Sequence, residues 1–144
     1  MKPEDVQAEQ LLVDTDVFSY VAAGKGRHAD FEPFLSYRVL VLSFATVAEL
    51  WYLAEKAGWG DRRRRDLALK IAGHAIVYPD MRVAQKWAEL SAAFRGQLGG
   101  GETHDLWTAA CAMVHGIPMI TNNLRHFQPV AHAFPELQLV HPDL

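Results

Sequence analysis

Residues 99–127, GGGETHDLWTAACAMVHGIPMITNNLRHF, decide the fold of this chain. Three glycines interrupt the preceding segment, and Thr103 can cap a new helix. The apolar positions of this helix recur at helical spacing, at Leu106, Ala109, Ala110 and Met113. The apolar run 117–120 then predicts a buried parallel strand that leads directly into the polar residues 121–123. The stretch therefore contains a helix with Asp105 in its opening turn, a buried strand and a polar strand exit.

Short apolar runs alternate with helical patterns along the rest of the chain. Besides 117–120, strand candidates lie at 11–13, 39–42, 75–78 and 137–140. Helical patterns lie at 17–21, 29–37, 46–57, 61–73 and 80–98, with a loop or short helix at 129–135. This alternation predicts an α/β protein, a three-layer α/β/α fold with a central mainly parallel five-stranded sheet. We expect a flexible N-terminal tail at 1–10 and a single domain over 11–144.

Composition narrows the class of protein. The 144 residues are 50% hydrophobic, which suits one domain with one core. No run approaches the roughly 18 apolar residues of a membrane span, and the acidic start does not resemble a signal peptide, so we expect a cytoplasmic protein. Cys111 is the only cysteine, which excludes an internal disulfide and argues against a zinc-thiolate site. The net charge of -3 argues against a protein that coats nucleic acid by bulk charge.

Four polar side chains follow strands or open helices at one predicted edge of the sheet. Asp14 follows the first strand, Glu49 opens the helix after the second, Asp105 opens the central helix, and Asn123 follows the fourth strand. Each has a purely structural interpretation. Asp14 can be a helix N-cap, Thr46 and Glu49 have the spacing of a capping box, and Asp105 can complement a helix dipole.

The convergence of these residues favours a metal site. The carboxyl ends of parallel strands meet at one crevice, where three like charges are costly unless a cation offsets them. Oxygen ligands select Mg²⁺ or Mn²⁺, with Asp14, Glu49 and Asp105 as the candidate ligands. Such an ion suits phosphodiester hydrolysis by an activated water. Thr121 can hydrogen-bond a carboxylate or a substrate phosphate, and the neutral Asn123 can orient the site.

The segments LLVDTDVFSYV, TVAEL, HDLWTAACA and MITNNLRHF, in this order, resemble the PIN domain and specifically the VapC-type ribonuclease toxins of toxin–antitoxin modules. The resemblance covers residues 11–140. It places Asp14, Glu49 and Asp105 as the three core acids and Asn123 at the fourth position of the site. The activity it implies is Mg²⁺- or Mn²⁺-dependent endonucleolytic cleavage of RNA.

The resemblance also implies partners. Proteins of this type commonly form homodimers, and a VapB-type antitoxin fills their active-site groove in a heterotetramer or larger assembly. Three features depart from the family pattern. Asn123 leaves three certain carboxylates, and Asp16 stands where the family often has a small polar residue. Asp16 can restore part of the missing charge, and it ranks second to Asp14. The tail before residue 11 is also longer than usual.

Binding to the phosphates of the RNA backbone requires positively charged side chains. The candidates are Lys25, Arg27, Arg62, Arg63, Arg64, Arg65 and Arg125. The dense cluster at 62–65 is flanked by aspartates, and a solvated helix face explains it at least as well. Among the aromatic residues, helical spacing places Trp51 in the core, whereas Tyr52 and Trp59 are expected to be more accessible.

Two other functions fit part of the pattern. Asp14 and Asp16 could be the nucleophile and the acid of a haloacid-dehalogenase-like phosphatase, although Phe18 occupies a position where that motif has Thr or Val. The fold could also serve as a non-catalytic PIN-fold interaction module. The intact acids count against the non-catalytic module, and the phosphatase is disfavoured by Phe18 and by the lack of a convincing later lysine and acidic-pair motif.

Overall fold

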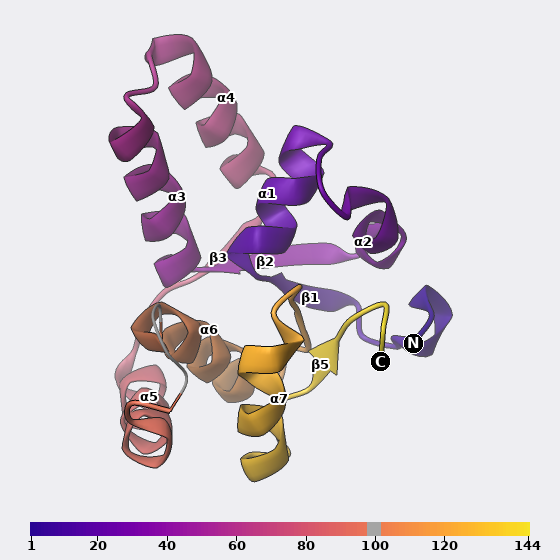
Figure 1. The fold of residues 1–144 in the computed structure, drawn as a ribbon, viewed down its shortest axis with the longest axis vertical. Coiled ribbons are helices and arrows are strands. Elements are labelled where there is room, and N and C mark those ends of the chain that lie inside the picture. Colours follow the sequence, from indigo (N-terminus) through magenta and orange to yellow (C-terminus); the bar gives the residue numbers. More distant parts are fainter. Residues whose placement is uncertain (98–101) are drawn as a thin grey trace.

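The computed structural model describes residues 1–97 and 102–144, and it has a central sheet between two layers of helices (Figure 1). All its strand pairs are parallel, in the order β3-β2-β1-β4-β5. The strands are β1 (Gln10–Val13), β2 (Val39–Ser43), β3 (Ala75–Val77), β4 (Met119–Ile120) and β5 (Leu139–Val140). The predicted three-layer fold with a five-stranded sheet is confirmed.

The helices that connect these strands cover both faces of the sheet. They are α1 (Thr15–Ala23), α2 (His28–Leu35), α3 (Phe44–Ala57), α4 (Asp61–Ala72), α5 (Met81–Phe94), α6 (Glu102–His115) and α7 (Leu124–Ala133). A short 3₁₀ helix, η1 (Pro3–Asp5), precedes β1. None of the helices in the described ranges is long and apolar enough to cross a membrane.

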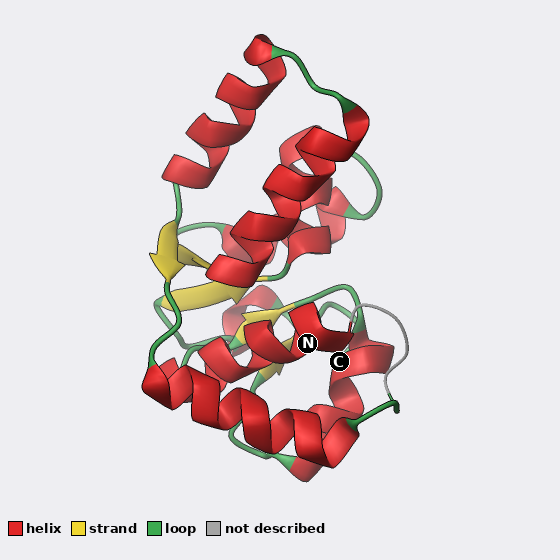
Figure 2. Ribbon diagram, turned by 90° about the vertical axis from the view of Figure 1, so that its left-hand side faces the viewer, coloured by secondary structure: helices red, strands yellow, loops and turns green. Residues whose placement is uncertain are grey.

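Alternating side chains of the strands build two cores. Leu12 of β1 packs into the core shared with α5, α6 and α7. Its neighbours Leu11 and Val13 pack into the core shared with α1, α2, α3 and α4, because successive strand residues point to opposite faces. Figures 1 and 2 show the α3–α4 hairpin projecting away from the sheet on this second side.

The start of α3 differs from the predicted capping box. Ser43 is the N-cap, and its hydroxyl accepts a hydrogen bond from the backbone amide of Thr46 at 3.1 Å. The capping box that was predicted from Thr46 and Glu49 is therefore wrong, because the helix begins one turn earlier, at Phe44. Glu49 is consequently not needed as a cap.

The segment after β4 also differs from the prediction. A loop or short helix was expected at 129–135, but α7 begins at Leu124, directly after the strand exit. Pro129 lies inside this helix, where a proline usually signals a break. Phe127 and Val130 are buried on one face of α7, and this burial holds the helix against the core. The predicted cap at Thr103 and the glycine break before it lie outside the residues whose side chains are described.

The N-terminal segment runs along Arg38. The guanidinium group donates hydrogen bonds to the carbonyl oxygens of Pro3, Val6 and Ala8 at 3.0, 2.7 and 3.2 Å. These contacts hold the segment beside the start of β2. The flexibility of the tail stays a prediction.

Candidate active site

Asp14 lies at the point where the strand order reverses. It follows β1, and its backbone amide donates to the carbonyl oxygen of Ile120 in β4 at 3.0 Å. Its carboxylate accepts hydrogen bonds from the Thr15 amide at 2.9 Å and from the Thr121 hydroxyl at 2.8 Å. Asp14 is thus the N-cap of α1, as its structural interpretation predicted, and it also stands in the crevice where open α/β sheets bind ligands.

Thr121 joins Asp14 to Asn123. While its hydroxyl donates to Asp14, the same oxygen accepts a hydrogen bond from the Asn123 amide at 2.9 Å. Thr121 is fully buried, whereas Asn123 is half-buried at the start of α7. The backbone after β4 is therefore fixed relative to the Asp14 carboxylate, and the Asn123 side chain lies at the same edge of the sheet.

A group of hydroxyls holds Glu49. The Thr15 hydroxyl donates to Oε2 of Glu49 at 3.0 Å and lies 3.2 Å from the hydroxyl of Thr46. Ser43 continues the group, with its hydroxyl 3.0 Å from that of Thr108 on α6. These contacts link α1, α3 and α6 beneath the carboxylates. Thr15 was not predicted as a site residue, because its contact with Glu49 joins residues that are 34 positions apart.

Asp105 is paired with a histidine. Nδ1 of His126 lies 2.6 Å from Oδ2 of Asp105, and the two side chains are 20% and 22% exposed. The contact joins α6 to α7. His126 is a further site residue that was not predicted, and its position six residues after the end of β4 was the only signal in the sequence.

The pKa values show that the carboxylates interact. Burial raises the pKa of Asp14 to about 8, and the charges of Asp16 and Asp105 add to the rise, although the hydrogen bond from Thr121 opposes it. Burial also raises the pKa of Asp16, with a further contribution from the charge of Glu49. The pKa of Asp105 is raised by burial and by Glu49 and Asp16, against the lowering effect of His126. The structure therefore brings all four predicted acids into one electrostatic cluster.

The geometry agrees with a family match over most of the chain. The model of the PIN domain family matches residues 11–133. The chain belongs to the PIN domain family. This assignment leaves the haloacid-dehalogenase-like alternative without support.

Solved structures share the fold of this PIN domain. A chain of VapBC2 from Rickettsia felis, bound to a promoter DNA fragment, is 19% identical with a TM-score of 0.73, and the match covers 91% of this chain and 97% of that one. A chain of VapBC-1 from nontypeable Haemophilus influenzae is 22% identical with a TM-score of 0.70, and the match covers 94% of this chain and 99% of that one. A chain of DNA-bound VapBC from Salmonella typhimurium is 24% identical with a TM-score of 0.69, and the match covers 92% of this chain and 98% of that one. No curated protein matches this sequence.

The carboxylates of this PIN domain do not form a complete set of metal ligands by themselves. Within residues 1–97 and 102–144, no three Asp, Glu, His or Cys side chains stand close enough together to hold an ion. Glu49 turns toward Thr15, and Asp105 turns toward His126. The donors are all oxygens, however, and Mg²⁺ is usually held by one or two carboxylates, waters and substrate phosphates. The donor set therefore fits such an ion.

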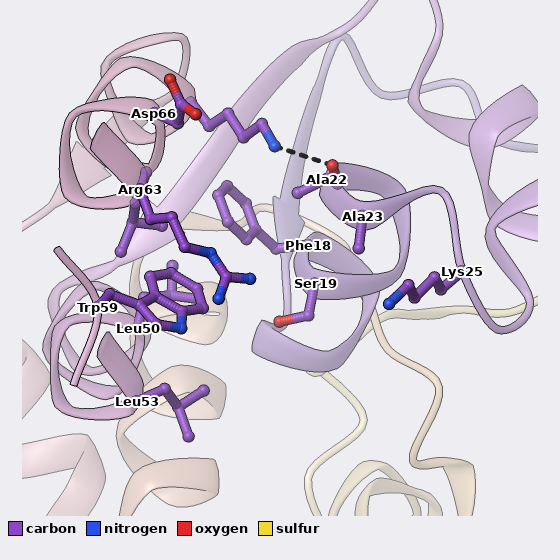
Figure 3. Close-up of a pocket in the computed structure, with 12 residues that line it drawn as sticks. Phe18, Ser19, Ala22, Ala23, Lys25, Leu50, Leu53, Trp59, Arg63 and Asp66 are labelled. Atoms are coloured by element: carbon purple, nitrogen blue, oxygen red, sulfur yellow. Dashed lines mark hydrogen bonds between the residues drawn. The ribbon is translucent and has the colours of Figure 1, made fainter. Parts of the chain in front are cut away.

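An apolar groove lies between α1, α3 and α4 (Figure 3). It has a volume of about 500 Å³, and its apolar lining includes Phe18, Leu50, Leu53, Trp59 and Leu67. Leu50 directly follows Glu49 in α3, and Phe18 lies two residues after Asp16 in α1, so the groove and these two acids share the same helices. Of the two aromatic residues expected to be accessible, Tyr52 is 63% exposed, whereas Trp59 is half-buried and lines this groove.

The predicted basic residues lie in three separate places: Lys25 and Arg27 between α1 and α2, where Arg27 pairs with Asp30 and Asp143, the cluster at 62–65 on α4, and Arg125 on α7. Arg64 ties the α3–α4 turn together, since it donates to the carbonyl oxygen of Trp59 at 2.7 Å and to the Glu55 carboxylate at 2.8 Å. Arg63 stacks over Trp59, with its guanidinium carbon 4.5 Å from the ring centroid. Arg62 and Arg65 are exposed on α4. Arg125 lies instead on α7, two residues after Asn123.

Proposed function

We propose that this PIN domain is a Mg²⁺- or Mn²⁺-dependent endoribonuclease that acts as the toxin of a toxin–antitoxin pair. One observation carries the proposal: Asp14 stands at the reversal point of a parallel sheet, where burial, together with the nearby charges of Asp16 and Asp105, raises its pKa to about 8. A bound cation would offset both the burial of the carboxylate and the like charges around it. The VapBC complexes among the structural neighbours support the toxin role.

Asp14, Glu49 and Asp105 would hold the ion, and Asp16 would add charge beside them. Bound there, Mg²⁺ or Mn²⁺ would polarise the scissile phosphodiester and make a water molecule a stronger nucleophile. No covalent enzyme intermediate is required.

The residues of the chain supply orientation and proton transfer. The Thr15 hydroxyl positions Glu49, and the His126 imidazole positions Asp105. One of these carboxylates accepts the proton of the attacking water as the phosphodiester bond breaks. Thr121 fixes Asp14, and the neutral Asn123 orients substrate or water without adding charge.

The groove between α1, α3 and α4 is the proposed site of a VapB-type antitoxin. Its lining is apolar, and an amphipathic segment of a partner buries its own apolar face in grooves of this kind. A segment seated there would lie beside Glu49 and could block the acids. We also propose the homodimer and the larger antitoxin complex that the family resemblance implies.

RNA cleavage by site variants tests the nuclease. The wild-type chain, Asp14→Asn and Asp105→Asn would be incubated with a labelled single-stranded RNA in Mg²⁺ and in EDTA. Asp61→Asn, which removes an exposed carboxylate at the start of α4, is the matched control. We expect cleavage only with the metal, and losses of at least about 100-fold in both site variants but not in the control.

Two results would contradict the proposal. Cleavage that persists in EDTA would remove the role of the metal. Full activity of either site variant would remove the assigned residues. A wild-type chain that folds and binds an antitoxin but never cleaves RNA would instead support the non-catalytic interaction module.

A further inference from the structure

A second cavity lies at the other side of the acidic cluster. It has a volume of about 420 Å³ and is lined by Gln97, Asn123, Arg125, His126 and Pro129. Four of the five lining side chains are polar, in contrast to the apolar lining of the groove between α1, α3 and α4. Its volume falls within the range of about 300 to 1,000 Å³ that is typical of small-ligand sites.

Two residues that line the cavity, His126 and Asn123, are also connected to the acids. His126 lines it, and Nδ1 of the same ring lies 2.6 Å from the Asp105 carboxylate. Asn123 also lines it, and its backbone amide is tied through the Thr121 hydroxyl to Asp14. A ligand that occupies the cavity therefore lies next to the carboxylates on which the proposed hydrolysis depends.

Arg125 gives this cavity a positive charge. Its side chain is exposed, and within the two described ranges it forms no ion pair with a carboxylate. Arg27, Arg64 and Arg82, by contrast, are each paired with an aspartate or a glutamate. A strand of RNA that approaches a cluster of acids needs such a cation for its phosphates.

We propose that this cavity binds one nucleotide of a single-stranded RNA, next to the bond that is cleaved. Arg125 binds the phosphate of this nucleotide. The side-chain amides of Gln97 and Asn123 can both donate and accept hydrogen bonds, so they suit the edge of an unstacked base. This inference rests on the proposed nuclease function and adds to it a subsite with a named phosphate contact.

RNA binding without cleavage tests the subsite. The affinity of the full chain for a labelled single-stranded RNA would be measured by fluorescence anisotropy in EDTA, over a range of salt concentrations. Arg125→Ala is compared with Arg82→Ala, which removes the same charge from a residue that does not line the cavity. Both arginines are exposed, so both variants should fold.

We expect Arg125→Ala to weaken binding about tenfold for every RNA sequence, since one charge-assisted contact is lost. The salt dependence should fall by about 0.7 in log–log slope, the value for one phosphate of a single strand. Gln97→Ala should change the relative affinities for oligonucleotides of different base composition, and it should leave the salt slope unchanged.

The subsite is refuted if Arg125→Ala binds RNA as tightly, and with the same salt slope, as Arg82→Ala. Such a result could coexist with metal-dependent cleavage by the wild-type chain, and the nuclease proposal would then stand. Conversely, weaker binding by Arg125→Ala together with an absence of cleavage by the wild type would support the subsite while the nuclease proposal fails.

Discussion

Replacing Asp14 with asparagine should make the metal-free protein more stable at neutral and alkaline pH. The carboxylate is 7% exposed and is held by the Thr15 amide and the Thr121 hydroxyl. Asparagine has nearly the same shape. Its carbonyl can accept from the Thr15 amide, and its NH₂ group can donate to the Thr121 oxygen, because a hydroxyl can also accept. The substitution therefore removes a buried ionisable group and keeps both contacts.

The pKa of Asp14 gives the sign and the size of the effect. The folded protein keeps a proton on this carboxyl up to its raised pKa of about 8, whereas the unfolded chain releases it near the ordinary pKa of 3.8. Between these values the free energy of unfolding of the wild type falls as pH rises, by up to about 1.4 kcal/mol per pH unit. The full loss, with an upper limit of about 6 kcal/mol, is reached near pH 8. Asp14→Asn has no ionisable group at this position, so its free energy of unfolding should not fall in this way as pH rises.

Urea denaturation in EDTA at several pH values between 4 and 8 measures the difference. The midpoints of wild type and Asp14→Asn should be close at pH 4 and should separate as pH rises, with the variant more stable. Asp61→Asn changes an exposed carboxylate and should follow the wild type. Parallel pH profiles for wild type and Asp14→Asn would refute the argument that burial and like charges raise the pKa of Asp14.

Three further predictions concern the neighbours of the acids. Thr121→Val removes the donor to Asp14 and should lower the free energy of unfolding by about 1 to 3 kcal/mol in urea titrations; an unchanged midpoint would argue against this bond. His126→Ala should lower kcat about tenfold with little change in KM, and His126→Asn, whose amide can replace Nδ1 beside Asp105, should restore most of it. Equal kcat values for the two variants would exclude a positioning role. Leu53→Glu places a charge in the apolar groove and should weaken binding of the cognate antitoxin at least about tenfold in calorimetry, whereas an unaltered affinity would place the antitoxin elsewhere.

The sequence predicted the elements whose signal is local. The strands are short apolar runs, and Asp14 and Thr121 are the polar residues that directly follow β1 and β4. The parallel alternation then implied that the exits share one edge of the sheet, which the hydrogen bond between Asp14 and Thr121 confirms.

The contacts that complete the cluster could not be predicted, because they depend on tertiary packing and side-chain rotamers. Thr15 was interpreted as a residue leading into a helix, and only the packing of α1 against α3 brings its hydroxyl to Glu49. From the sequence, His126 could contact phosphate or be ordinary polar surface, and only the packing of α7 against α6 brings it to Asp105. Pro129 suggested a loop or short helix at 129–135, where the structure has α7. A local proline signal was outweighed by the burial of Phe127.

The most direct test of the account is the rate of RNA cleavage as a function of Mn²⁺ concentration, for the wild-type chain and for Asp105→Asn. Because Asp105 is assigned as a ligand, its loss should move the half-saturating Mn²⁺ concentration upward by at least about tenfold and should lower the rate at saturation. Cleavage in the absence of Mn²⁺, or two titration curves that superimpose, would contradict the account.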